Sequence, residues 1–150
     1  MSVTPSLFER VGGTPTLQRV HKNLYKKIYA HPWISQYFQD KPQWLQEQQQ
    51  THFMMKLMGG EVRYMGKPAV SAHQHMVITE ELFELRQSLL SSALTEEGVT
   101  KELRDEWLRV DATMKRAIVK SSAADCRVAY EGQPILDFPN PRNAASRRAG

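Results

Sequence analysis

Pro68-Ala-Val-Ser-Ala-His-Gln-His-Met-Val-Ile-Thr79 lies near the middle of the chain, between two runs of helical periodicity. It follows a Gly59-Gly60 pair, which ends the preceding helix, and a loop with further turn residues. We predict a short helix from about Ala69 to Met76. Thr79 should then cap a new helix, because its hydroxyl precedes acidic residues that suit the positive end of a helix. The sequence therefore predicts a reduced helical piece between two longer helices.

Glycine and proline residues divide the rest of the chain into helices. Gly12-Gly13 ends a short first helix, and His31-Pro32 turns the chain after the second. A short turn-rich stretch precedes the third. In the last helix an apolar residue recurs at every third or fourth position as far as Ile118. The predicted long helices are Pro15–Ala30, Pro42–Met58, Thr79–Gly98 and Thr100–Ile118, which together predict an all-α fold.

Composition is that of an ordinary single globular domain. The chain has 150 residues, a formal net charge of +4 and a single cysteine, Cys126. One cysteine cannot form an intramolecular disulfide, and no apolar run approaches the ~18 residues that suggest a membrane span. The first residues do not have the pattern of a signal peptide. We therefore expect a cytoplasmic protein, and since basic and acidic side chains are interspersed, a nucleic-acid partner is disfavoured.

Composition changes after residue 120. From Ser121 onward Gly, Pro, Asn and Ala dominate, and three prolines fall within 134–141. Such segments rarely bury enough apolar surface to form a core of their own. We predict a domain over residues 1–120 and a mobile C-terminal tail over 121–150, in which Val128–Phe138 docks on the body.

The predicted helix from Pro42 to Met58 carries two amides on one face. Gln46, Gln50, Phe53 and Leu57 are spaced 4, 3 and 4 residues apart, so they share that face. A buried amide without a partner costs about 1–3 kcal/mol, so a polar ligand or a nearby hydroxyl would explain this arrangement. The alternative is that both glutamines lie on the solvent edge of the helix.

The histidines do not form a recognisable bare-metal site. His73 and His75 would lie about 200° apart on a helix, so one helical segment cannot turn both onto a single ion. His21 and His31 have no companion ligands at metal spacings. No phosphate-binding loop, nucleophile elbow or catalytic triad is evident. By itself, His73 is an ordinary histidine on a short helix.

Several short motifs follow one another between residues 6 and 120. In order they are Leu7-Phe-Glu-Arg-Val-Gly-Gly13, Leu24-Tyr25, Phe38, Gly59-Gly60, Tyr64-Met-Gly66, Ala72-His73, Ile78-Thr79 and Phe83. In this order and spacing they resemble the truncated haemoglobins, nearest to group I. The resemblance implies an all-α, truncated globin-like two-over-two helical sandwich. It also implies haem b (iron protoporphyrin IX) as the cofactor.

The resemblance assigns roles to individual residues. His73 looks like the proximal ligand of the haem iron, with His75 as the fallback, and Phe38 like the aromatic that packs on the porphyrin. Tyr25 matches the distal tyrosine, while Gln50 and Gln46 match distal positions that face the bound gas. The pocket is expected to be lined by Phe53, Met54, Leu57, Met76, Val77, Ile78, Phe83, Val110 and Met114, with Tyr64, Lys41, Arg63 and Lys67 as candidates to meet the propionates.

One residue departs from the family pattern. Arg86 falls roughly where relatives carry an apolar residue close to the haem, so either the pocket differs there or this side chain reaches a propionate. The resemblance otherwise implies a globin that binds the diatomic gases O2, NO and CO. Oxidation of nitric oxide to nitrate would need a partner reductase, since no flavin or nicotinamide site is evident.

A second class of function stays open at this stage. In a haem-free helical protein-interaction module, the Gln46/Gln50 face would be a partner groove and His73 a surface residue. The two classes differ in one property, because a haem protein loses thermal stability without its cofactor. The oligomeric state is left open by the sequence.

Overall fold

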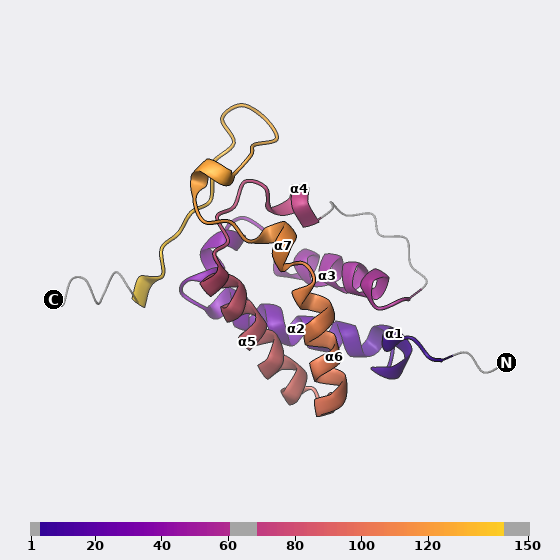
Figure 1. Ribbon diagram of the computed structural model, residues 1–150. Helices are drawn as coiled ribbons and strands as arrows, with labels where there is room; N and C mark the ends of the chain where they lie inside the picture. Colours follow the sequence, from indigo (N-terminus) through magenta and orange to yellow (C-terminus); the bar gives the residue numbers. More distant parts are fainter. Residues whose placement is uncertain (1–3, 61–68, 143–150) are drawn as a thin grey trace.

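The computed structural model describes residues 4–60 and 69–142 (Figure 1). These residues form helices and turns and include no β-strand, only two isolated bridges, Met76 with Leu136 and Ile78 with Val119. The all-α prediction is confirmed. Within the described residues no helix has the length and apolar character needed to cross a membrane.

The helices follow the predicted order. They are α1 (Leu7–Arg10), α2 (Thr14–Ala30), the 3-10 helix η1 (Ile34–Phe38), α3 (Gln43–Leu57), α4 (Ala69–His73), α5 (Glu80–Glu96), α6 (Lys101–Ala112), α7 (Lys115–Ile118) and the 3-10 turn η2 (Ala123–Asp125).

Two predicted helices differ from the structure. α4 ends at His73 and not near Met76, because the residues after it bond to other parts of the chain (below). The helix predicted as far as Ile118 is broken between α6 and α7. At the break, the Thr113 hydroxyl donates to the Val110 carbonyl at 2.6 Å, a local bond that competes with regular helix hydrogen bonding.

The core is built around α2. Its apolar stripe of Leu17, Val20, Leu24 and Ile28 is fully buried, as is Trp107 of α6. α2 packs on both α3 and α5, and α5 packs on α6. Figure 1 shows α5 and α6 side by side, with α2 crossing behind them. The helices thus form two packed layers, as expected when each buries one apolar stripe.

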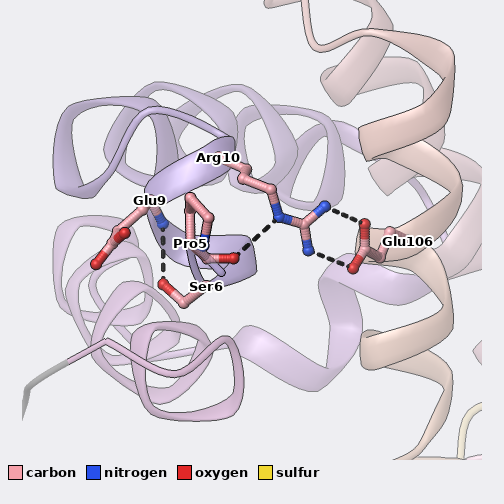
Figure 2. A network of polar contacts seen from close by, with 5 residues as sticks. All are labelled: Pro5, Ser6, Glu9, Arg10 and Glu106. Atoms are coloured by element: carbon pink, nitrogen blue, oxygen red, sulfur yellow. Dashed lines mark hydrogen bonds and ion pairs between the residues drawn. The ribbon is translucent and has the colours of Figure 1, made fainter. Parts of the chain in front are cut away.

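Local polar contacts fix where helices begin and how they meet. The Thr79 hydroxyl accepts a hydrogen bond from the Leu82 amide at the start of α5, as predicted. Thr100, in contrast, makes no side-chain capping bond to α6. Figure 2 shows how Arg10 of α1 joins α6: its guanidinium donates to both carboxylate oxygens of Glu106, at 2.7 and 2.6 Å. Polar contacts therefore hold both ends of α1, because the Ser6 hydroxyl also accepts a hydrogen bond from the Glu9 amide at its start.

Beyond residue 120 the chain returns to the body. The Leu136 amide donates to the His75 carbonyl at 2.9 Å, and the Trp33 indole donates to the Phe138 carbonyl at 2.7 Å. The docking expected for Val128–Phe138 is therefore found at its end, at Leu136 and Phe138, whereas Val128 stays exposed.

Candidate functional site

A cavity of about 480 Å³ opens between α2, α3, η1, α6, α7 and the segment from α4 to α5. This volume is in the range of small-molecule sites, about 300–1,000 Å³. Most of the side chains predicted for the site line it together. They are Tyr25, Phe38, Lys41, Gln46, Gln50, Phe53, His73, Met76, Ile78, Phe83 and Met114.

Some predicted residues lie elsewhere. Met54 is 1% exposed and packs in the core, and neither it nor Leu57 lines the cavity. Val77 and Val110 are likewise absent from the lining. Met54 shares a buried stripe of α3 with Thr51 and Met58, three and four residues away, and this stripe faces the core instead. The candidates Arg63, Tyr64 and Lys67 lie outside the described residues.

Tyr25 supplies a phenol from α2. Its ring meets Phe38 edge-on, with centroids 5.9 Å apart, and Phe38 also contacts Tyr29. Burial raises the pKa of the Tyr25 hydroxyl to about 12, and the positive charge of Arg86 opposes this shift. Over residues 4–60 and 69–142 this hydroxyl has no hydrogen-bond partner, although the side chain is 6% exposed. Tyr25 is therefore a neutral donor positioned by its aromatic neighbours and available to a ligand in the cavity.

α3 brings two amides to the same cavity. Gln46 and Gln50 are one turn apart, both are half-buried and both line the cavity, with Phe53 following on the same face. In the part of the chain that is described, neither amide is hydrogen-bonded to protein. Both amides therefore line a cavity that can hold a polar ligand, and their partial exposure also places them at the edge of the buried side of α3.

Two histidines line the cavity from the α4 side. α4 ends at His73, so His75 lies in the turn that follows and the helical separation of about 200° does not apply to the pair. Both side chains are half-buried. An imidazole is a common ligand of iron, and either ring can therefore supply one.

The segment after α4, residues 73–78, is held by parts of the chain far away in sequence. The Lys120 ammonium donates to the carbonyls of His73 and Met76, at 2.8 and 3.1 Å. The Arg127 amide donates to Gln74, and the Leu136 amide to His75. The Val77 amide donates in turn to the Leu136 carbonyl, and its own carbonyl accepts from the Tyr37 hydroxyl. Sequence reasoning missed these positioning residues, because each contacts a backbone group of residues 73–77 and no local pattern indicates such a partner.

An ion pair forms another part of the cavity wall. Arg86 of α5 donates to Asp111 of α6 at 2.6 Å, and both residues line the cavity. Arg86, which stands where the family resemblance led us to expect an apolar residue, is thus paired with a carboxylate of the protein. Asp111 was missed, although one signal was present: an acidic residue four positions after Trp107, on the apolar side of its helix.

The residues that line the cavity fit a haem. The wall combines imidazoles with apolar and aromatic side chains, and the described residues contain no group of three or more His, Cys, Asp or Glu that could hold a bare metal ion. Such a donor set suits an iron that already carries ligands of its own, as in a porphyrin with one axial histidine. Of the cations that the sequence offered as contacts of a propionate, Lys41 and Arg86 are described, and both line the cavity.

Comparison with known proteins agrees with this description. The sequence model of the family described as bacterial-like globin matches residues 6–120. A relative from Tetrahymena thermophila, named group 1 truncated hemoglobin, is 30% identical over 110 residues, which cover 73% of this chain and 91% of the relative.

Solved structures show the same arrangement of helices. The crystal structure of truncated hemoglobin from Tetrahymena pyriformis in the Fe(III) form has a TM-score of 0.73 and 26% identity, and the match covers 78% of this chain and 100% of that one. The 2/2 hemoglobin of a Synechococcus species, in the cyanomet state and with covalently attached heme, has a TM-score of 0.66 and 28% identity over 71% and 89% of the two chains. The predicted two-over-two sandwich is confirmed. The chain belongs to the bacterial-like globin family, as a group I truncated haemoglobin.

Proposed function

We propose that this chain binds haem b in the 480 Å³ cavity, with His73 as the iron ligand, and that it binds diatomic gases there. The observation that carries the proposal is one cavity that contains both an imidazole on the short helix α4 and an unpartnered, neutral phenol on α2 among the described residues. The Fe(III) form and the attached heme of the two solved relatives support the cofactor.

Haem would supply an iron that binds O2, NO or CO reversibly. The protein would supply the ligand to that iron and the polar surroundings of the gas. Tyr25 and Gln50 would donate to the negatively polarised atom of a gas held in the cavity, and Gln46 lies one turn earlier on α3, toward its start. Each such bond contributes about 0.5–1.5 kcal/mol net, and more when the acceptor carries charge. These donors should therefore slow the release of O2.

The iron ligand is tested by replacing the two histidines of the cavity separately. His73→Gly should abolish stable haem incorporation or the five-coordinate ferrous spectrum, while His75→Gly should leave both unchanged. The measurement is the ultraviolet–visible spectrum of the reconstituted protein in ferric, reduced and CO-bound states. If the roles of the two variants are reversed, His75 is the ligand; if the wild-type chain takes up no haem, the proposal is wrong.

The role of the donors is tested by O2 dissociation from the ferrous protein. Tyr25→Phe combined with Gln50→Leu should speed dissociation by roughly tenfold or more, the effect of losing two hydrogen bonds. Tyr29→Phe is a matched control, because it removes a hydroxyl of the same aromatic cluster that already donates to the Lys41 carbonyl at 2.8 Å. Equal dissociation rates in the double variant and the parent would remove both residues from this role.

The same gas site offers an enzymatic use. A globin that binds O2 and meets nitric oxide can form nitrate, and continued turnover would need electrons from a separate reductase in the same compartment. We propose the cytoplasm as that compartment, in keeping with the single cysteine. Nitrate formation that depends on an added reductase, and that is lost in His73→Gly, would test this use.

A further inference from the structure

The wall of the cavity contains an ion pair in addition to the residues proposed to meet the gas. Arg86 pairs with Asp111 at 2.6 Å, and their side chains are 21% and 4% exposed. Charges are rarely buried unless they are paired, because removing each from water costs several kcal/mol. This chain therefore maintains a cation at a site that apolar side chains could have filled.

Asp111 accepts a hydrogen bond from only one nitrogen of the Arg86 guanidinium. Its Oδ2 accepts from the Arg86 Nη1 and also from the Gln87 amide, at 2.6 and 2.5 Å, so the carboxylate is anchored from two side chains of α5. A guanidinium has five N–H donors in one plane. Within the described residues Asp111 is the sole hydrogen-bond partner of the Arg86 side chain, so other donors remain for a ligand in the cavity.

Arg86 belongs to α5, which packs on α2. Its charge opposes the upward pKa shift that burial causes at Tyr25, whereas the Asp111 carboxylate adds to that shift. Arg86 also adds to the downward pKa shift caused by burial of His21. Arg86 and Tyr25 both line the cavity. A cationic donor and a neutral phenol therefore face the same space, a pair suited to a small ligand with a full negative charge.

We propose that Arg86 and Tyr25 form an anion site in this cavity, in which Asp111 sets the strength of the positive charge and the ligand class is the small inorganic monoanion. The inference rests on the proposed function, because such an anion would occupy the ferric protein in place of a neutral gas. It adds a preference that the donors Tyr25 and Gln50 alone do not give: a ligand with a full negative charge gains more from the charge of Arg86 than a gas that is only polarised.

The test compares one anion with one neutral ligand in the haem-loaded chain. Azide binding to the ferric form and CO binding to the ferrous form are both titrated through the Soret band at pH 7 and constant salt. Asp111→Asn keeps the shape of the pair and leaves Arg86 uncompensated, so the azide Kd should fall by roughly tenfold. The double change Arg86→Met with Asp111→Asn removes both charges, so no unpaired charge is left buried. It should raise the azide Kd by roughly tenfold, because the cationic donor is lost.

A surface ion pair provides the matched control. Glu106→Gln makes the same change in net charge as Asp111→Asn, beside Arg10 where α1 meets α6 (Figure 2). Because that pair is partly exposed and does not line the cavity, solvent and salt screen it and the azide Kd should stay within about twofold of the wild type. The CO affinity should change less than the azide affinity in both cavity variants, since CO carries no charge.

The outcomes separate this inference from the function on which it rests. Normal haem spectra with an unchanged azide Kd in both cavity variants would overturn the anion site and leave the globin function intact. Parallel changes in azide and CO affinity would also overturn it, because they would report a change of cavity shape. Failure of the wild-type chain to take up haem would overturn both.

Discussion

Acid should destabilise this protein through one buried histidine, His21 of α2. Its side chain is 1% exposed, with Nδ1 2.7 Å from the Thr51 hydroxyl and its ring edge-on to Trp107. Burial lowers the pKa of His21 from 6.5 to about 3, and the nearby Arg86 adds to the shift. The folded protein therefore keeps this ring neutral at pH values where the unfolded chain protonates it.

The direction and size of the effect follow from proton linkage. Because the folded pKa is the lower one, the contribution of His21 to stability is fully present above about pH 6.5 and is lost as the pH falls toward about 3. The value pH 4 lies about 2.5 units below the unfolded pKa of 6.5 and above the folded pKa, and each unit is equivalent to about 1.4 kcal/mol, so His21 should account for a loss of about 3 kcal/mol. The free energy of unfolding of a domain of this size is about 5–15 kcal/mol, so the loss is a large fraction of the total stability.

Urea unfolding at pH 7 and pH 4 measures this loss. The full chain is used without haem, so that acid release of the cofactor does not contribute. His21→Gln lowers the baseline stability but has no proton to bind, and it should lose about 3 kcal/mol less than the wild type between the two pH values. His52→Gln removes a histidine outside the buried core and should keep the full loss. Equal acid losses in wild type and His21→Gln would refute the reasoning.

Three further substitutions test how the site is held in place. Thr79→Ala removes the cap of α5 and should lower the free energy of unfolding by about 1 kcal/mol in urea titrations. Lys120→Met removes the donor to the His73 carbonyl and should destabilise the protein by about 1–3 kcal/mol. It should also speed haem loss, measured by transfer to an acceptor globin in excess; an unchanged rate would mean that this contact does not position the ligand. Phe138→Ala removes the edge-on contact with Tyr37 at 5.1 Å and should lower the thermal midpoint, corresponding to about 1–2 kcal/mol.

The long helices could be predicted because their signals are local. The apolar stripe of α2 repeats at steps of three and four residues, and the structure buries each of its members. The hydroxyl of Thr79 lies directly before acidic residues, and it caps α5 as expected. In both places a few neighbouring residues determine the structure. The same locality explains why Gln46 and Gln50 could be placed on one face.

The early end of α4 could not be predicted, because contacts distant in sequence decide it, and the break after α6 depends on a local bond of Thr113 that the apolar stripe does not reveal. α4 ends at His73 where the carbonyls of Gln74 and His75 accept from Arg127 and Leu136 rather than from amides of a continuing helix. Nothing in residues 69–76 indicates those partners. The pairing of Arg86 with Asp111 likewise joins two helices. The sequence identified Arg86 as a departure from the family pattern and did not single out Asp111, and the packing of α5 on α6 explains how the two residues pair.

The contacts around His73 extend beyond the part of the chain that matches the family. The family match ends at residue 120. Gln74 and His75, which follow His73 directly, accept hydrogen bonds from the amides of Arg127 and Leu136, beyond the end of that match. The Met76 amide donates to the His73 carbonyl itself. A histidine at the end of a five-residue helix has few constraints of its own, because so short a helix is unstable alone. Its orientation must therefore depend on Lys120 and on the segment that bonds to Gln74, His75 and Val77. In this globin the fold places the histidine near the cavity, and the chain after residue 120 completes the support of that position.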